Sequence, residues 1–225
     1  MGLNKRLIPT FGEGETGLAD TGLFGTQVGH WGFEQNLNDS EGNYNFTASG
    51  TIFYSTAAYE GDYSLGFNFD SHISANGDGI KGLMNATYTG WAKSFWIRAN
   101  YSSGMSIFTN RSLGIAIESS NWTNDNYLRR YSGGNWSNFH NFSLNGKYQD
   151  YFFVLNYDGT TLSLYVNNVL KVSTTSGFSR QDFNWDINRN VNGTNRNPEN
   201  RIDDLRVFNA PLTSDQRTEL YEAYP

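Results

Sequence analysis

The sequence contains no cysteine among its 225 residues and only four prolines. The absence of cysteine excludes a disulfide framework as the source of stability. Glycine occurs 24 times, and aromatic residues make up 16% of the chain. Many glycines and aromatic residues with few prolines are typical of short strands joined by turns, so the composition favours an all-β sandwich.

Positive charge and long apolar runs are also scarce. Charged residues make up 17% of the chain, the net charge is −6, and the pI is near 5.0. A nucleic-acid partner is therefore not expected, because binding to it needs a cationic surface. No apolar run approaches the roughly 18 residues of a membrane span, so no membrane association is expected. Residues 1–17 lack the apolar core of a secretory signal, so we expect synthesis in the cytoplasm.

Strand-like patterns begin at Val28 and continue along the chain. Two tight turns are expected, at Asp158-Gly159 and at Asn167-Asn168, because these residues favour reversals with positive φ. Long connections are expected over 119–147 and 189–200, and no repeat or second core is evident. The predicted strands cover 28–34, 51–56, 63–69, 93–99, 105–110, 113–119 and three segments within 150–174.

The last 25 residues predict a strand followed by a helix. Thr213 and Gln216 have the spacing of a capping box, which predicts a helix over 213–224. In the preceding strand, strict alternation places Asp203 on one face with Leu205 and Val207, and Asp204 on the other. A carboxylate on an apolar face needs a cation or hydrogen-bond donors.

The order of these motifs resembles the laminin-G-like, or concanavalin A-like, domains. The segments that carry the resemblance are GHWGFEQNLNDSEGNYNFTASGTIFYSTAAYEGDYSLGFNF, SFWIRA, YFFVLNYDGTTLSLYVNNVLKVST and RIDDLRVFNAPLTSDQRTELY. The resemblance covers residues 28–225 and implies a single antiparallel β-sandwich jelly roll with a short C-terminal helix. The N-terminal segment 1–27 lies outside it.

The same resemblance implies a structural Ca²⁺ ion that joins an early loop to the C-terminal strand. The matching positions are Asp39 and Asn43 in the loop and Asp203 in the strand. Carboxylate and amide oxygens are suitable ligands for Ca²⁺. In the alternative interpretation, Asp39 and Asp203 accept backbone N–H groups and hold the loop without a metal.

An aromatic-rich segment within 119–147 is a candidate carbohydrate site. Aromatic rings cover the apolar face of a sugar, and the surrounding Asn and Ser residues can bind its hydroxyl groups. In the alternative interpretation, these aromatic residues belong to the core or to a protein interface. The candidate residues are Trp122, Tyr127, Tyr131 and Trp136.

Catalysis is not expected from the sequence. Glycanases of this fold carry closely spaced carboxylates on one strand, and no such strand is present. Glu60-Gly61-Asp62 lies in a turn-like stretch, and alternation separates Asp203 from Asp204. The three histidines, at positions 30, 72 and 140, are isolated from one another in the sequence.

Three functional hypotheses follow. Residues 1–27 are Gly-rich, and we expect them to form an extended arm that is held by its own domain or, preferably, by a neighbouring subunit. The first hypothesis is therefore a bacteriophage virion protein, a capsid decoration or tail-associated protein, whose partners are other virion proteins or copies of itself. The second is a lectin-like module that binds polysaccharide outside the cell or at its surface. The third is a glycan hydrolase with an unusual site.

Overall fold

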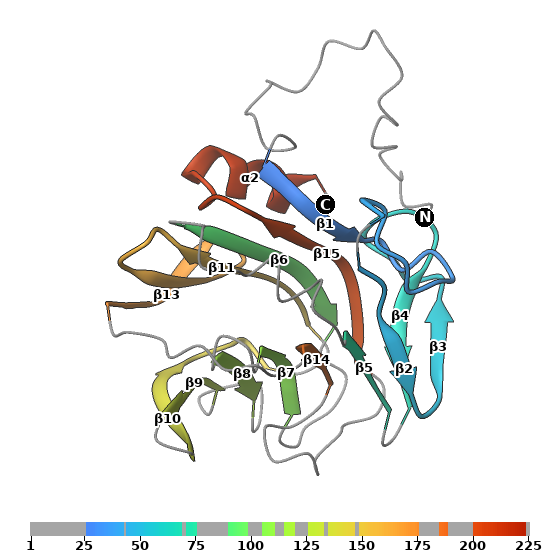
Figure 1. Ribbon diagram of the computed structural model, residues 1–225, viewed down its shortest axis with the longest axis horizontal. Helices are drawn as coiled ribbons and strands as arrows, with labels where there is room; N and C mark the ends of the chain where they lie inside the picture. The colour runs from blue at the N-terminus through green and yellow to red at the C-terminus, as the bar shows by residue number, and fades with distance from the viewer. Residues whose placement is uncertain are drawn as a thin grey trace, which may run out of the picture.

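The described part of the chain forms two antiparallel sheets that lie face to face (Figure 1). This arrangement confirms the expected β-sandwich. The computed structural model describes residues 26–42, 44–68, 71–75, 90–98, 105–110, 115–119, 126–132, 135–146, 149–175, 185–188 and 200–223.

One sheet has eight strands within the described residues, and the other has seven. The eight-stranded sheet has the order β13 (Val169–Thr174), β12 (Leu162–Val166), β11 (Asp150–Tyr157), β6 (Trp91–Arg98), β15 (Arg201–Phe208), β4 (Ser64–Phe67) and β3 (Ile52–Ser55), with β1 (Gln27–Trp31) also paired to β15. The seven-stranded sheet has the order β10 (Asn135–Phe142), β9 (Asn126–Ser132), β8 (Ile115–Ser119), β7 (Met105–Asn110), β14 (Trp185–Ile187), β5 (His72–Ala75) and β2 (Thr47–Ser49).

The main core lies between the two sheets and is built by alternation. In β12, Leu162, Leu164 and Val166 are buried, while the two residues between them are partly exposed. Phe95 of β6 stacks on Phe153 of β11 with ring centroids 5.3 Å apart. Strands with alternating apolar residues are therefore buried on one face only, because that face packs against the other sheet.

A second apolar cluster lies on the outer face of the eight-stranded sheet, under helix α2 (Ser214–Glu222) (Figure 1). Leu220 of the helix packs in this cluster with Trp96 of β6. The Thr213 hydroxyl accepts the Gln216 N–H at 3.3 Å, and the Gln216 side-chain oxygen accepts the Thr213 N–H at 2.9 Å. The predicted capping box is therefore confirmed. Among the described residues, no helix has the length and apolar character that a membrane crossing requires.

Two turn predictions are confirmed with different geometries. Asn167 and Asn168 have φ values of 50° and 60°, as a two-residue hairpin turn requires. The Asp158-Gly159 turn is longer. Within it, the Asp158 carboxylate accepts the N–H groups of Thr160 and Thr161.

Two parts of the strand prediction are wrong. The segment 119–147 contains the hairpin of β9 and β10 rather than one long connection, because its polar, Asn-rich sequence hides the alternation. Short strands β2, β5 and β14 were not predicted either. At the start of the chain, Gln27, the last residue of the predicted arm, pairs with Phe208. The rest of the arm, residues 1–25, lies outside the described residues.

The predicted alternation along β15 is also wrong. Ile202, Leu205 and Val207 belong to the main core, whereas Asp203 does not. Asp203 pairs with Trp96 and Arg206 with Ser94, so β15 has one residue more than β6 over this stretch. Asp204 has a φ of 47°, which accommodates this β-bulge.

Candidate functional site

The bulge of β15 lies where the edge of this strand changes partner. Arg201 and Ile202 pair with β4, whereas residues 205–208 pair with β1. Asp203 and Asp204 occupy the position between these two pairings. The connection between β3 and β4 approaches them there, and it brings Tyr59 and Glu60 beside the bulge.

Asp203 binds this connection through backbone groups. One of its carboxylate oxygens accepts the N–H groups of Tyr59 at 2.6 Å and Glu60 at 3.1 Å. The other accepts the N–H of Asp204 at 2.8 Å. Burial raises the pKa of Asp203 to about 8, against the effect of the three N–H groups, which favour the ionised form.

A second carboxylate holds the other end of the same connection. Glu34 accepts the N–H groups of Asp62 at 2.9 Å and Tyr63 at 3.2 Å. Gly61 lies between these contacts with a φ of 59°, and a Cβ atom there would collide with the Glu34 carboxylate. The position of Glu60 is therefore fixed from both sides, and Gly61 is required for it.

Asp39 makes equivalent contacts in the early loop. Its carboxylate accepts the N–H groups of His30 at 2.8 Å, Glu41 at 3.1 Å and Tyr44 at 3.2 Å. The contacts of Asp39 and Asp203 match the metal-free alternative of the sequence analysis. Asn43 lies outside the described residues, and the calcium site stays a prediction.

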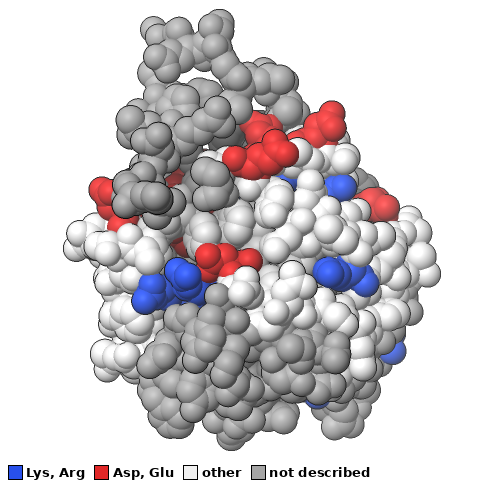
Figure 2. Space-filling view, turned by 180° about the vertical axis from the view of Figure 1, so that it is seen from behind, with Lys and Arg blue, Asp and Glu red and all other residues white. Residues whose placement is uncertain are grey.

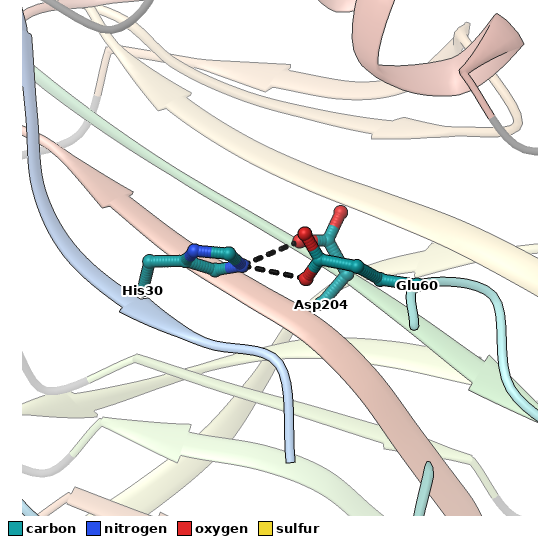
Figure 3. A group of neighbouring side chains, drawn as sticks. All are labelled: His30, Glu60 and Asp204. Atoms are coloured by element: carbon teal, nitrogen blue, oxygen red, sulfur yellow. Dashed lines mark hydrogen bonds and ion pairs between the residues drawn. The ribbon is translucent and has the colours of Figure 1, made fainter. Parts of the chain in front are cut away.

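Four charged side chains converge beside the bulge, and we call them the junction network: His30, Glu60, Asp204 and Arg206. His30 Nε2 lies 2.7 Å from Glu60 Oε2 and 3.1 Å from Asp204 Oδ1 (Figure 3). Arg206 donates from Nε to the same Asp204 oxygen at 2.6 Å and from Nη2 to Glu60 Oε1 at 3.1 Å. Each carboxylate thus contacts both cationic side chains.

The electrostatics of the junction network follow from its burial. Burial disfavours the charged imidazolium, but its hydrogen bonds to Asp204 and Glu60 prevail and raise the pKa of His30 to about 9. Burial, with help from Asp204, raises the pKa of Glu60. Burial also opposes ionisation of Asp204, but Arg206 and His30 overcome it and hold its pKa below the usual range.

His30, Glu60 and Asp204 also form a potential metal-binding triad. One ligand atom from each lies within 4.8 Å of the others. However, the Arg206 guanidinium contacts both carboxylates, so a metal ion there would meet a fixed positive charge. The geometry therefore favours an internal ion network over a metal site.

Little in the sequence predicts this network. His30 is isolated from the other histidines in the sequence. In the structure its ring contacts Glu60 and Asp204, which follow it by 30 and 174 positions. Asp203 and Asp204 were expected on opposite faces, but the bulge brings both beside Glu60. The available signal is the pair of adjacent acidic residues, Asp203 and Asp204, in a strand that also contains Arg206.

A different polar surface lies on the outer face of the seven-stranded sheet, and we call it the β9 face: Glu118, Tyr127, Arg129 and Asn141. Leu128 is buried in the main core, so Tyr127 and Arg129 on either side of it point outward. Tyr127 is in register with Glu118 of β8 and with Asn141 of β10. Arg129 Nη1 donates to Glu118 at 2.6 Å.

The predicted carbohydrate residues are only partly placed. Tyr127 lies on the β9 face and is half-buried. Tyr131 and Trp136 are register partners in the β9–β10 hairpin. Trp122 lies outside the described residues.

Figure 2 shows Asp and Glu side chains gathered toward the top of one face of the molecule. Lys and Arg side chains occur there only in separate places, so the described residues of this face form no broad cationic patch. This distribution agrees with the net charge of −6.

No protein-family model and no curated protein matches the chain. Similar solved structures include domain 4 of AbnA, a GH43 extracellular arabinanase from Geobacillus stearothermophilus, in complex with arabinotriose. The TM-score is 0.69 and the identity 21%, over 87% of this chain and 98% of that domain.

Botulinum neurotoxin domains are similar as well. Type C, which depends upon interaction with two ganglioside molecules to enter cells, has a TM-score of 0.69 at 16% identity, over 90% of this chain and 52% of the other. The binding domain of neurotoxin DC, in complex with rat synaptotagmin II, has a TM-score of 0.67 at 17% identity, over 89% and 52%. This chain thus spans about half the length of the neurotoxin domains.

These similarities show the fold, an antiparallel β-sandwich. The proteins in these solved structures bind glycans or receptors.

Proposed function

We propose that this chain is a glycan-binding β-sandwich domain that has no catalytic role of its own and binds its ligand on the β9 face. The fold is similar to that of a domain in complex with arabinotriose and of a toxin that interacts with gangliosides. These comparisons support the lectin-like hypothesis better than the virion hypothesis. A virion protein that binds glycans would satisfy both.

The observation that carries the proposal is the surrounding of Tyr127. Its register neighbours are the exposed Asn141 on one side and Glu118 on the other, with Arg129 bound to Glu118. An aromatic ring beside an amide and a carboxylate provides a surface for the apolar face of a sugar and partners for its hydroxyl groups.

The β9 face also suits a binding role because its charges are paired. Glu118 and Arg129 neutralise each other at 2.6 Å, and their side chains are 13% and 18% exposed. A paired carboxylate and guanidinium still offer lone pairs and N–H groups to sugar hydroxyls. We therefore expect a neutral sugar at this position rather than a polyanion.

The hydrolase hypothesis is less well supported. Glu60 and Asp204 are the two carboxylates of the junction network, but the Asp204 side chain is 0% exposed. A glycosidase needs both carboxylates in contact with the scissile bond. Asp204 instead binds Arg206 and His30.

Glycan-array screening followed by calorimetry tests the proposal. Replacing Tyr127 with Ala should weaken binding of the best glycan by about tenfold or more, because the stacking surface is lost. Tyr165→Ala is a matched control, since Tyr165 is a half-buried tyrosine of β12 in the other sheet. No binding to any glycan, or equal losses in both variants, would contradict the proposal.

A further inference from the structure

The resemblance to laminin-G-like domains implies a Ca²⁺ ion between the loop at Asp39 and the strand at Asp203. Protein groups also join these two regions. His30 links the two regions, because its backbone N–H binds Asp39 and its ring binds Asp204. Ser40 of the same loop contacts the other ring nitrogen of His30 at 3.1 Å.

The two predicted calcium ligands are already engaged. Each carboxylate accepts three backbone N–H groups: Asp39 those of His30, Glu41 and Tyr44, and Asp203 those of Tyr59, Glu60 and Asp204. A carboxylate has about four acceptor positions, so most of them are occupied on each. Ca²⁺ needs six to eight oxygen ligands. Supplying them here would break backbone hydrogen bonds that hold both loops.

The charge that a metal would supply is also present. Asp204 is fully buried, and it receives Arg206 at 2.6 Å and His30 at 3.1 Å on one oxygen. Glu60 receives His30 at 2.7 Å and Arg206 at 3.1 Å on separate oxygens. Two cationic and two acidic side chains balance when all four are ionised. A divalent cation beside them would be repelled by the guanidinium, which does not lose its proton.

We infer that this chain joins its early loop to its C-terminal strand through His30, and the 59–60 segment to that strand through Arg206, at the place where the resemblance implies Ca²⁺. The donor set does not fit the metal, because N–H groups occupy the Asp39 and Asp203 carboxylates, and the Arg206 guanidinium occupies the neighbouring Asp204 and Glu60. The junction then holds the loop at Asp39 and the 59–60 segment on β15 without a divalent cation. This inference is independent of glycan binding.

Thermal unfolding of the full chain tests the inference. The melting temperature is measured in excess EDTA, in CaCl₂ and in MgCl₂ at matched ionic strength, for the wild type and for Asp39→Asn. We expect the wild-type value to differ by less than about 1 °C among the three solutions. A rise of several degrees in CaCl₂ that Asp39→Asn abolishes would overturn the inference. A rise that Asp39→Asn leaves intact would place the ion elsewhere and leave the junction metal-free.

A second variant tests the role of the guanidinium. Arg206→Lys keeps the positive charge but cannot contact Asp204 and Glu60 with a planar fork. We expect its melting temperature to fall by several degrees in EDTA and in CaCl₂ alike. An unchanged melting temperature would show that Arg206 does not hold the junction. Circular dichroism of the variant before heating establishes that it is folded.

Discussion

The junction network and the β9 face both pair a carboxylate with a guanidinium, yet they differ in what surrounds the pair. In the junction network, Asp204 is 0% and Arg206 6% exposed, and His30 and Glu60 complete their contacts. On the β9 face, Glu118 and Arg129 retain 13% and 18% exposure beside the exposed Asn141. The pair in the junction network is therefore enclosed, whereas the pair on the β9 face keeps some exposure.

The largest expected difference between the two regions is in stability. Arg206→Gln leaves the buried Asp204 without its main cation, which should lower the free energy of unfolding by about 3–5 kcal/mol. Arg129→Gln breaks a partly exposed pair and should cost about 1 kcal/mol or less. Urea unfolding of both variants measures these values. Equal losses would contradict the distinction between the two regions.

The pH dependence of stability should also come from the junction network. His30 faces Glu60, Asp204, Arg206 and Ser40, and its pKa is raised to about 9. Because the folded-state pKa exceeds the unfolded one, its contribution is complete below the ordinary value of 6.5 and is lost as the pH rises through about 9. The contribution is at most about 3 kcal/mol.

His30→Gln should remove this dependence. The difference in unfolding free energy between wild type and variant should shrink between about pH 6 and about pH 10. Asp203, whose pKa is also raised, is present in both proteins, so the difference isolates His30. A difference that stays constant over this range would contradict the assignment.

The smallest expected effect on stability, and the clearest effect on binding, belongs to Glu118. Glu118→Gln should change the free energy of unfolding by less than about 1 kcal/mol, because the pair is partly exposed. It should nevertheless weaken glycan binding several-fold, because a hydroxyl acceptor is lost. Glu60→Gln is the matched control and should alter stability but not glycan affinity. Calorimetry and urea unfolding of both variants distinguish these outcomes.

The strands of the sandwich could be predicted where one side of the sequence is consistently apolar. The alternation of Leu162, Leu164 and Val166 predicts a half-buried strand, and the capping box of Thr213 and Gln216 predicts the helix. The β9–β10 hairpin was missed because its sequence is polar on both faces in many places. Its candidate aromatic residues were found by composition alone.

The sequence by itself determined the β class, the hairpin at Asn167-Asn168 and the C-terminal helix, because these depend on local alternation and turn chemistry. Only the tertiary structure decided the junction network, since a bulge of one residue at Asp204 changes which side chains share a face. The tertiary structure also brings together His30, Glu60 and Asp204, which are far apart in the chain. Long-range contacts of this kind follow from strand pairing, which local periodicity does not specify.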